Sequence, residues 1–72
     1  MARLTPAQYD ALEHAIANAT RVVVMRRGTE YVIVPLRLRT EGRHEIIEAR
    51  NPTTGDSLSF ALDDIDTVHV VR

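Results

Sequence analysis

The side chains most suited to binding chemistry are those of nine arginines, and the chain contains no lysine. Seven of them lie between residues 21 and 50 beside four glutamates, whereas residues 51–72 hold four aspartates and one arginine. The planar guanidinium group suits phosphate and base recognition. The clustering favours contact with a polyanion through one basic surface, because the net charge of the whole chain is −1. A general preference for arginine over lysine would produce the same residue choice.

The spacing of the arginines suggests where such a surface lies. Arg37 and Arg39 alternate with Leu36 and Leu38, so we expect them to share the exposed face of a strand if the leucines face the core. The other candidates sit at the tips of two predicted hairpins, where phosphates would displace counterions. The predicted nucleic-acid-binding residues are Arg26, Arg27, Arg37, Arg39 and Arg43. The alternative is an ordinary solvated face, because glutamates interleave and few aromatic rings are available to stack bases.

A second group of polar residues is the acidic segment Asp63-Asp64-x-Asp66, followed by His69. Carboxylates bind hard cations, but the spacing matches no calcium loop. We predict instead that Asp63 or Asp64 caps a short helical turn between two strands. No metal and no cofactor are expected.

Catalysis is not expected either. Ser57 and Ser59 alternate with core residues on a predicted strand, and the histidines at positions 14, 44 and 69 are far apart. The chain has no cysteine, which removes thiol nucleophiles and thiolate metal sites. We therefore predict a binding protein that is not an enzyme.

One helix, about residues 6–19, is predicted before all the strands. Thr5 can cap it, Pro6 suits the first helical position, and Gln8 completes a capping box. Apolar residues then recur at helical spacing and form one stripe: Tyr9, Leu12, Ile16 and Ala19.

Five strand-like segments follow, and they predict a small barrel over about residues 21–71. The segments are 21–26, 30–39, 44–50, 58–62 and 66–71. Pro35 cannot donate to a strand ladder, so it indicates an edge, a bulge or a sharp bend. Tyr9 and Phe60 are expected in the core. The predicted fold is mainly β with one N-terminal α-helix and a five-stranded, strongly bent antiparallel small barrel, formed by residues 1–72 as a single domain.

The sequence resembles the WYL domain, a module with a small Sm-like barrel. The matching residues are Ala15-Ile16, Val34-Pro35, Leu38, Ala49 and Phe60-x-Leu62-Asp63-x-Ile65. The resemblance implies nucleic-acid or small-ligand binding in a regulatory part of a transcription factor or defence protein. The family's aromatic pair corresponds to Glu45-Ile46-Ile47, and its basic positions to Leu58, Ala61 and Asp64, so these signature residues are missing.

The order of elements is also similar to that of bacterial Sm-like RNA chaperones, whose rings form by edge pairing of the last two strands. Two partners are therefore expected: single-stranded RNA or DNA, or further copies of the chain paired through edge strands. The opposite charges of residues 21–50 and 51–72 favour head-to-tail contact between copies. The alternative function is accordingly a protein-interaction or homo-oligomerisation module, or a small-ligand sensor, with no nucleic-acid role.

The expected location is cytoplasmic, with no membrane partner. Nothing in the sequence resembles a signal peptide, and no apolar run approaches the roughly 20 residues needed to span a bilayer.

Overall fold

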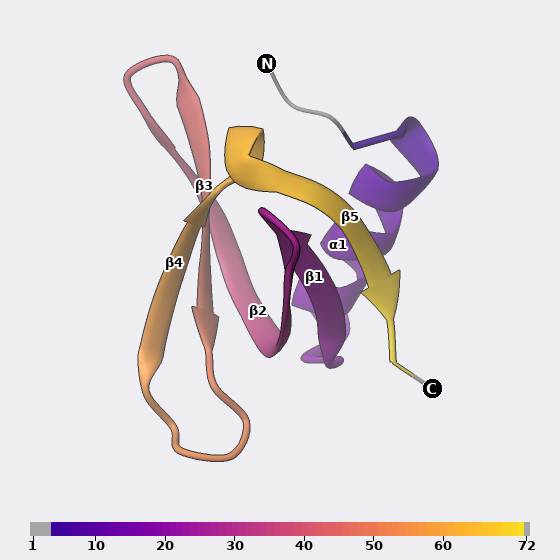
Figure 1. Ribbon diagram of the computed structural model, residues 1–72, viewed down its shortest axis with the longest axis vertical. Helices are drawn as coiled ribbons and strands as arrows, with labels where there is room; N and C mark the ends of the chain where they lie inside the picture. The colour runs from indigo at the N-terminus through magenta and orange to yellow at the C-terminus, as the bar shows by residue number, and fades with distance from the viewer. Residues whose placement is uncertain (1–3, 72) are drawn as a thin grey trace.

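The computed structural model describes residues 4–71 as one helix followed by a five-stranded antiparallel sheet (Figure 1). The elements are α1 (Pro6–Asn18), β1 (Val22–Arg26), β2 (Thr29–Glu41), β3 (His44–Arg50), β4 (Ser57–Ala61), the 3₁₀ turn η1 (Leu62–Asp64) and β5 (Ile65–Val70). The strand order is β4-β3-β2-β1-β5, and the sheet is strongly bent but not closed. The predicted fold class is confirmed. Within residues 4–71, no helix is both long and apolar enough to cross a membrane.

The start of α1 is fixed by its capping box, as predicted. The Thr5 hydroxyl accepts a hydrogen bond from the Gln8 amide at 3.1 Å, and the Gln8 side chain accepts one from the Thr5 amide at 3.2 Å. The helix ends at Ala19, whose φ of 53° is left-handed. The prediction that Ala19 belongs to the buried stripe is wrong, because this cap exposes it; Ala15 is buried instead.

A bend in β2 divides the strand into two parts. Ile33 lies opposite Val22 of β1, whereas Val34 lies opposite Arg50 of β3. Figure 1 shows β2 turning sharply between these two pairings. Beyond the bend, Pro35 pairs with Ala49. One strand thus serves both halves of the sheet.

A bulge accompanies this bend. Pro35 is opposite Ala49 and Arg37 is opposite Glu48, the next residue along β3, so Leu36 is an extra residue without a cross-strand partner. The predicted bend or bulge at Pro35 is confirmed. The prediction that Leu36 faces the core is wrong: Leu36 is 51% exposed, because the bulge resets the alternation and leaves Leu38 inside.

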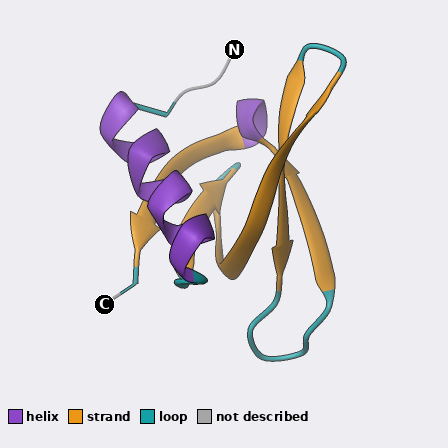
Figure 2. Ribbon diagram, turned by 180° about the vertical axis from the view of Figure 1, so that it is seen from behind, coloured by secondary structure: helices purple, strands orange, loops and turns teal. Residues whose placement is uncertain are grey.

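The core lies between α1 and the concave side of the bent sheet, and α1 packs against β5 and β2 (Figure 2). The buried cluster consists of Leu12, Ala15, Val22, Val24, Ile33, Ile47, Ala49, Phe60, Leu62, Ile65 and Val68. Phe60 belongs to it as expected, and Tyr9 packs partly buried against it. Within residues 4–71, every buried side-chain nitrogen or oxygen has a hydrogen-bond partner.

A polar contact joins α1 to the sheet. The Tyr9 hydroxyl donates a hydrogen bond to the Glu45 carboxylate on β3, with an O–O distance of 2.6 Å. This hydrogen bond, reinforced by burial and by the negative charges of Glu45 and Glu13, raises the pKa of Tyr9 from 10.0 to about 12.

Replacing Tyr9 with Phe should lower the free energy of unfolding by about 1–2 kcal/mol, because a partly buried hydrogen bond to a charged group is lost. The folded pKa of Tyr9 is raised, so its stabilisation is complete below pH 10.0 and is lost as pH rises toward about 12. Urea unfolding of both proteins at pH 7 and through this alkaline range measures the difference. A difference that stayed constant up to pH 12 would contradict the assignment.

Candidate functional site

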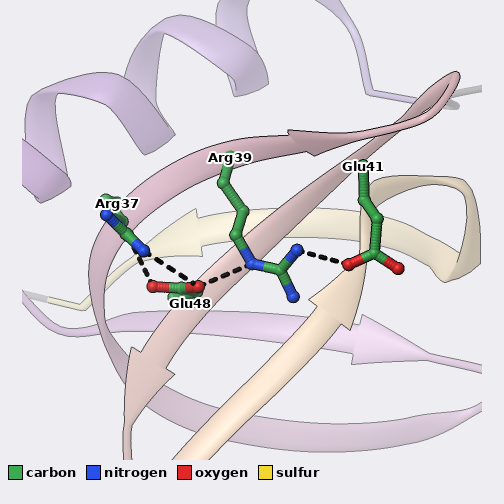
Figure 3. Close-up of polar contacts among 4 residues, drawn as sticks. All are labelled: Arg37, Arg39, Glu41 and Glu48. Atoms are coloured by element: carbon green, nitrogen blue, oxygen red, sulfur yellow. Dashed lines mark hydrogen bonds and ion pairs between the residues drawn. The ribbon is translucent and has the colours of Figure 1, made fainter.

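Two of the candidate arginines lie side by side in a chain of ion pairs on the outer face of β2 and β3 (Figure 3). Nε of Arg37 and Nε of Arg39 each lie 2.6 Å from a different oxygen of Glu48. Nη1 of Arg39 also lies 2.5 Å from Glu41. We call these four residues the Glu48 network.

The backbone explains this geometry. After the bulge, Arg37 lies directly opposite Glu48, and Arg39 follows two residues later on the same face of β2. The side chain of Arg37 is 67% exposed and that of Arg39 is 35% exposed. The expectation that both arginines share an outer face describes their position correctly.

Charge in the Glu48 network is balanced, with two guanidinium groups against two carboxylates. The Arg37 guanidinium, followed by that of Arg39, lowers the pKa of Glu48; Arg39 likewise lowers the pKa of Glu41. In return, hydrogen bonds to Glu48 and Glu41 raise the pKa of Arg37 and Arg39. The two arginines therefore expose N–H donors to solvent, while the carboxylates of Glu48 and Glu41 balance their positive charge.

The arginines of the first hairpin have different partners. The guanidinium carbon of Arg26 lies 5.7 Å from the centre of the Phe60 ring, which is a cation–π distance. Phe60 in turn meets the Tyr31 ring edge to face at 5.2 Å. Arg27 adopts a left-handed φ of 51° in the tight turn with Gly28, and its Nη2 lies 3.4 Å from Asp64.

The second hairpin places Arg43 at its exposed tip, where no described side chain pairs with it. Next to it, Nδ1 of His44 lies 3.1 Å from Asp63. The prediction that Asp63 or Asp64 caps the turn is wrong: the N-cap of η1 is Ala61, which makes no side-chain capping bond. Both aspartates instead contact the hairpins on either side of η1 (Figure 1).

The five candidate arginines thus do not form one patch. Arg37 and Arg39 come together, Arg26 covers Phe60, and Arg27 and Arg43 lie near separate hairpin tips. Part of the charge asymmetry noted in the sequence is compensated inside the chain, through the ion pair of Arg27 with Asp64. Sequence reasoning missed Glu48 as the shared partner. Glu48 could have been predicted as the partner only from its position opposite Arg37 on the neighbouring strand, and that register cannot be assigned without knowing where the bulge lies.

The part of the chain that the structure describes contains no cluster of metal-binding side chains. Within residues 4–71, no three histidine, aspartate or glutamate side chains gather where they could hold a metal ion.

Comparison with known proteins supports the fold. No protein-family model and no curated protein matches the sequence. Among solved structures, the chain is similar to proteasome accessory factor B/C (PafBC) of Arthrobacter aurescens, with a TM-score of 0.76 and 20% sequence identity. The match covers 97% of this chain and 12% of that chain. PafBC contains a WYL domain, so the WYL-like resemblance is confirmed for the fold.

Removing Arg37 should raise the pKa of Glu48 toward its ordinary value of 4.5, because Arg37 makes the largest contribution to the depression. The lowered folded pKa means that the network stabilises the protein above 4.5 and that this contribution is lost as pH falls through the folded value. Carboxyl ¹³C NMR titration of the wild type and Arg37→Gln measures the change. Arg43→Gln serves as the control, and an equal rise in that variant would contradict the assignment.

Proposed function

We propose that this chain is a small, non-enzymatic regulatory binding domain that contacts single-stranded nucleic acid through its arginine-bearing hairpins. The observation that carries the proposal is the pair Arg37 and Arg39, which lie together on an outer face and share one carboxylate. Two adjacent guanidinium groups match successive phosphates of a flexible strand. Arg43, at the exposed tip of the same hairpin, extends this surface.

Exchange of the internal carboxylate for a phosphate is physically reasonable. The ion pairs of the Glu48 network lie at the surface, where water and salt screen them and they contribute little to stability. A backbone phosphodiester carries one negative charge and two acceptor oxygens, as the Glu48 carboxylate does, so it can replace Glu48 as a bidentate partner of a guanidinium group. The network therefore holds both arginines extended in advance, and a strand that binds there replaces Glu48.

The WYL-like fold supports the proposal, since the family resemblance implies a regulatory role in binding nucleic acid or a small ligand. The signature positions of the family correspond here to Leu58, Ala61 and Asp64, which are not basic. The proposed contacts therefore rest on this chain's own arginines, on β2 and the turn after it.

Binding to single-stranded RNA or DNA should weaken with salt at a log–log slope of roughly −2 to −3, as expected for three or four phosphates. The double variant Arg37→Ala with Arg39→Ala should weaken binding and reduce the slope by about 1.4. Because surface ion pairs contribute little to stability, its urea unfolding midpoint should lie close to that of the wild type. Fluorescence anisotropy over a salt series measures both quantities.

A matched pair of charge-removing variants sharpens the same test. Glu48→Gln removes the carboxylate that both guanidinium groups share, leaving Arg39 paired with Glu41 alone, and should tighten nucleic-acid binding. Glu30→Gln removes the same charge from an exposed site on β2 and should change binding much less. Equal tightening in both variants would show a non-specific charge effect, and absent or salt-insensitive binding by the wild type would reject the proposal.

The second candidate function is a homo-oligomerisation or protein-interaction module, and the open sheet favours it. Among the strands formed by residues 4–71, one side of β4 and one side of β5 have no partner strand. Val70 on β5 and the following Val71 are each 38% exposed. Unpaired edges of this kind accept further strands.

Light scattering after size exclusion tests this candidate, since edge pairing predicts a mass that is a multiple of 8.1 kDa. Val70→Lys should shift the protein toward monomer, because an edge lysine opposes strand addition. Val32→Lys, at a position that is exposed but not on an edge strand, is the control. A wild-type protein that stays monomeric at about millimolar concentration would exclude self-assembly.

A further inference from the structure

We infer that Arg21 and Arg50 form a binding site for a small phosphorylated molecule. Both residues line a pocket of about 550 Å³. The pocket lies where β1 begins and β3 ends, at the end of these strands opposite the hairpin turns that carry Arg27 and Arg43. The site therefore goes beyond the proposed nucleic-acid surface and does not depend on it.

Strand register brings the two arginines together. Arg50 on β3 lies opposite Val34 on β2. Arg21 immediately precedes Val22, whose partner on β2 is Ile33, the residue before Val34, so Arg21 and Arg50 approach the same part of β2 from β1 and from β3. Val34 is 5% exposed and lies in the lining between them.

Among residues 4–71, no acidic side chain compensates the charge of the pocket. Arg27, Arg37 and Arg39 each pair with a carboxylate, and Arg26 lies over Phe60. In contrast, no described side chain forms an ion pair or hydrogen bond with Arg21 or Arg50. The residues that line the pocket include no aspartate or glutamate. Two permanent positive charges facing one cavity favour an anionic occupant.

The loop after β3 forms a preorganised wall of the same pocket. The Asn51 side-chain oxygen accepts hydrogen bonds from the amides of Thr53 and Thr54, at 2.8 and 3.2 Å. The amide of Gly55 donates to the Asn51 carbonyl at 2.8 Å. The Thr54 hydroxyl accepts from the Asp56 amide at 3.2 Å and keeps its own proton for donation. The wall thus adds one neutral donor, the Thr54 hydroxyl, to the two guanidinium groups.

The C-terminal end of α1 disfavours an anion in this pocket, but its negative partial charge is smaller than the positive charge of the two arginines. Ala19, the C-cap of α1, also lines the pocket, and the end of a helix carries a partial charge of roughly −0.5. Two full positive charges outweigh it. A phosphate monoester carries a charge of about −1.5 to −2 and has three acceptor oxygens. It can therefore accept hydrogen bonds from two guanidinium groups and a hydroxyl at once, whereas a carboxylate has only two oxygens.

The size of the pocket indicates more than inorganic phosphate. Small-molecule sites typically measure about 300–1,000 Å³, and 550 Å³ falls inside that range. The pocket therefore has room for a phosphate group and a body of sugar or nucleotide size.

NMR titration of the full chain with pyrophosphate and with adenosine monophosphate tests the site. Saturable amide shifts should appear at Arg21, Arg50 and residues 53–55. Arg21→Gln and Arg50→Gln should each weaken binding about tenfold, because each removes a charge-assisted hydrogen bond. The matched control is Arg43→Gln, another exposed arginine without a described partner, which should change affinity less than about twofold.

Four results would overturn the inference, and the wild-type titration gives the first without any variant. They are no saturable shift at these residues, an equal loss in Arg43→Gln, tighter binding of succinate than of pyrophosphate, and shifts that only an oligonucleotide produces. The last result would assign the pocket to a nucleic-acid surface instead. Failure of the hairpin variants to affect nucleic-acid binding would leave this titration unchanged, so the two proposals fail separately.

Discussion

The bend of β2 just before Pro35 and the extra residue Leu36 determine how the rest of the chain is arranged. Pro35 is buried opposite Ala49, and the bulge that follows shifts the alternation of side chains by one position. Since a one-residue shift moves every later side chain to the other face, strict alternation from the inward-facing Pro35 would turn Arg37 inward and Leu38 outward. The bulge thus keeps Leu38 in the core and places two arginines beside Glu48.

The same bend separates two basic surfaces that differ in their chemistry. On one side of it, Arg37 and Arg39 are paired with the carboxylates of Glu48 and Glu41. Where the bend begins, Arg21 and Arg50 flank Val34 without a carboxylate in the lining of their pocket. The first arrangement suits reversible, salt-sensitive contact with a strand, and the second suits capture of a compact anion.

Local signals in the sequence predicted much of the fold. The capping box of Thr5 and Gln8 and the interruption at Pro35 act within a few residues, so they can be recognised without a register. The WYL-like resemblance gave the arrangement of the barrel, although the signature positions differ. Leu36 was assigned to the core because alternation alone cannot show where a bulge resets it.

The candidate site was less accessible to sequence reasoning because its partners are distant along the chain. The positions of Asp63 and Asp64 suggested a helix cap, yet their contacts are to His44 and Arg27 across the sheet. The convergence of Arg21 and Arg50 depends on how β1 and β3 pair with the two halves of the bent strand β2, and no short motif reports it.

The most direct test of this arrangement is the pattern of cross-strand nuclear Overhauser effects along β2 and β3 in solution. The structure requires contacts from Pro35 to Ala49 and from Arg37 to Glu48, with none from Leu36 to the core residues Ile47 and Phe60. An unbroken register through Leu36, with its methyl groups in contact with those core side chains, would contradict the placement of both basic surfaces.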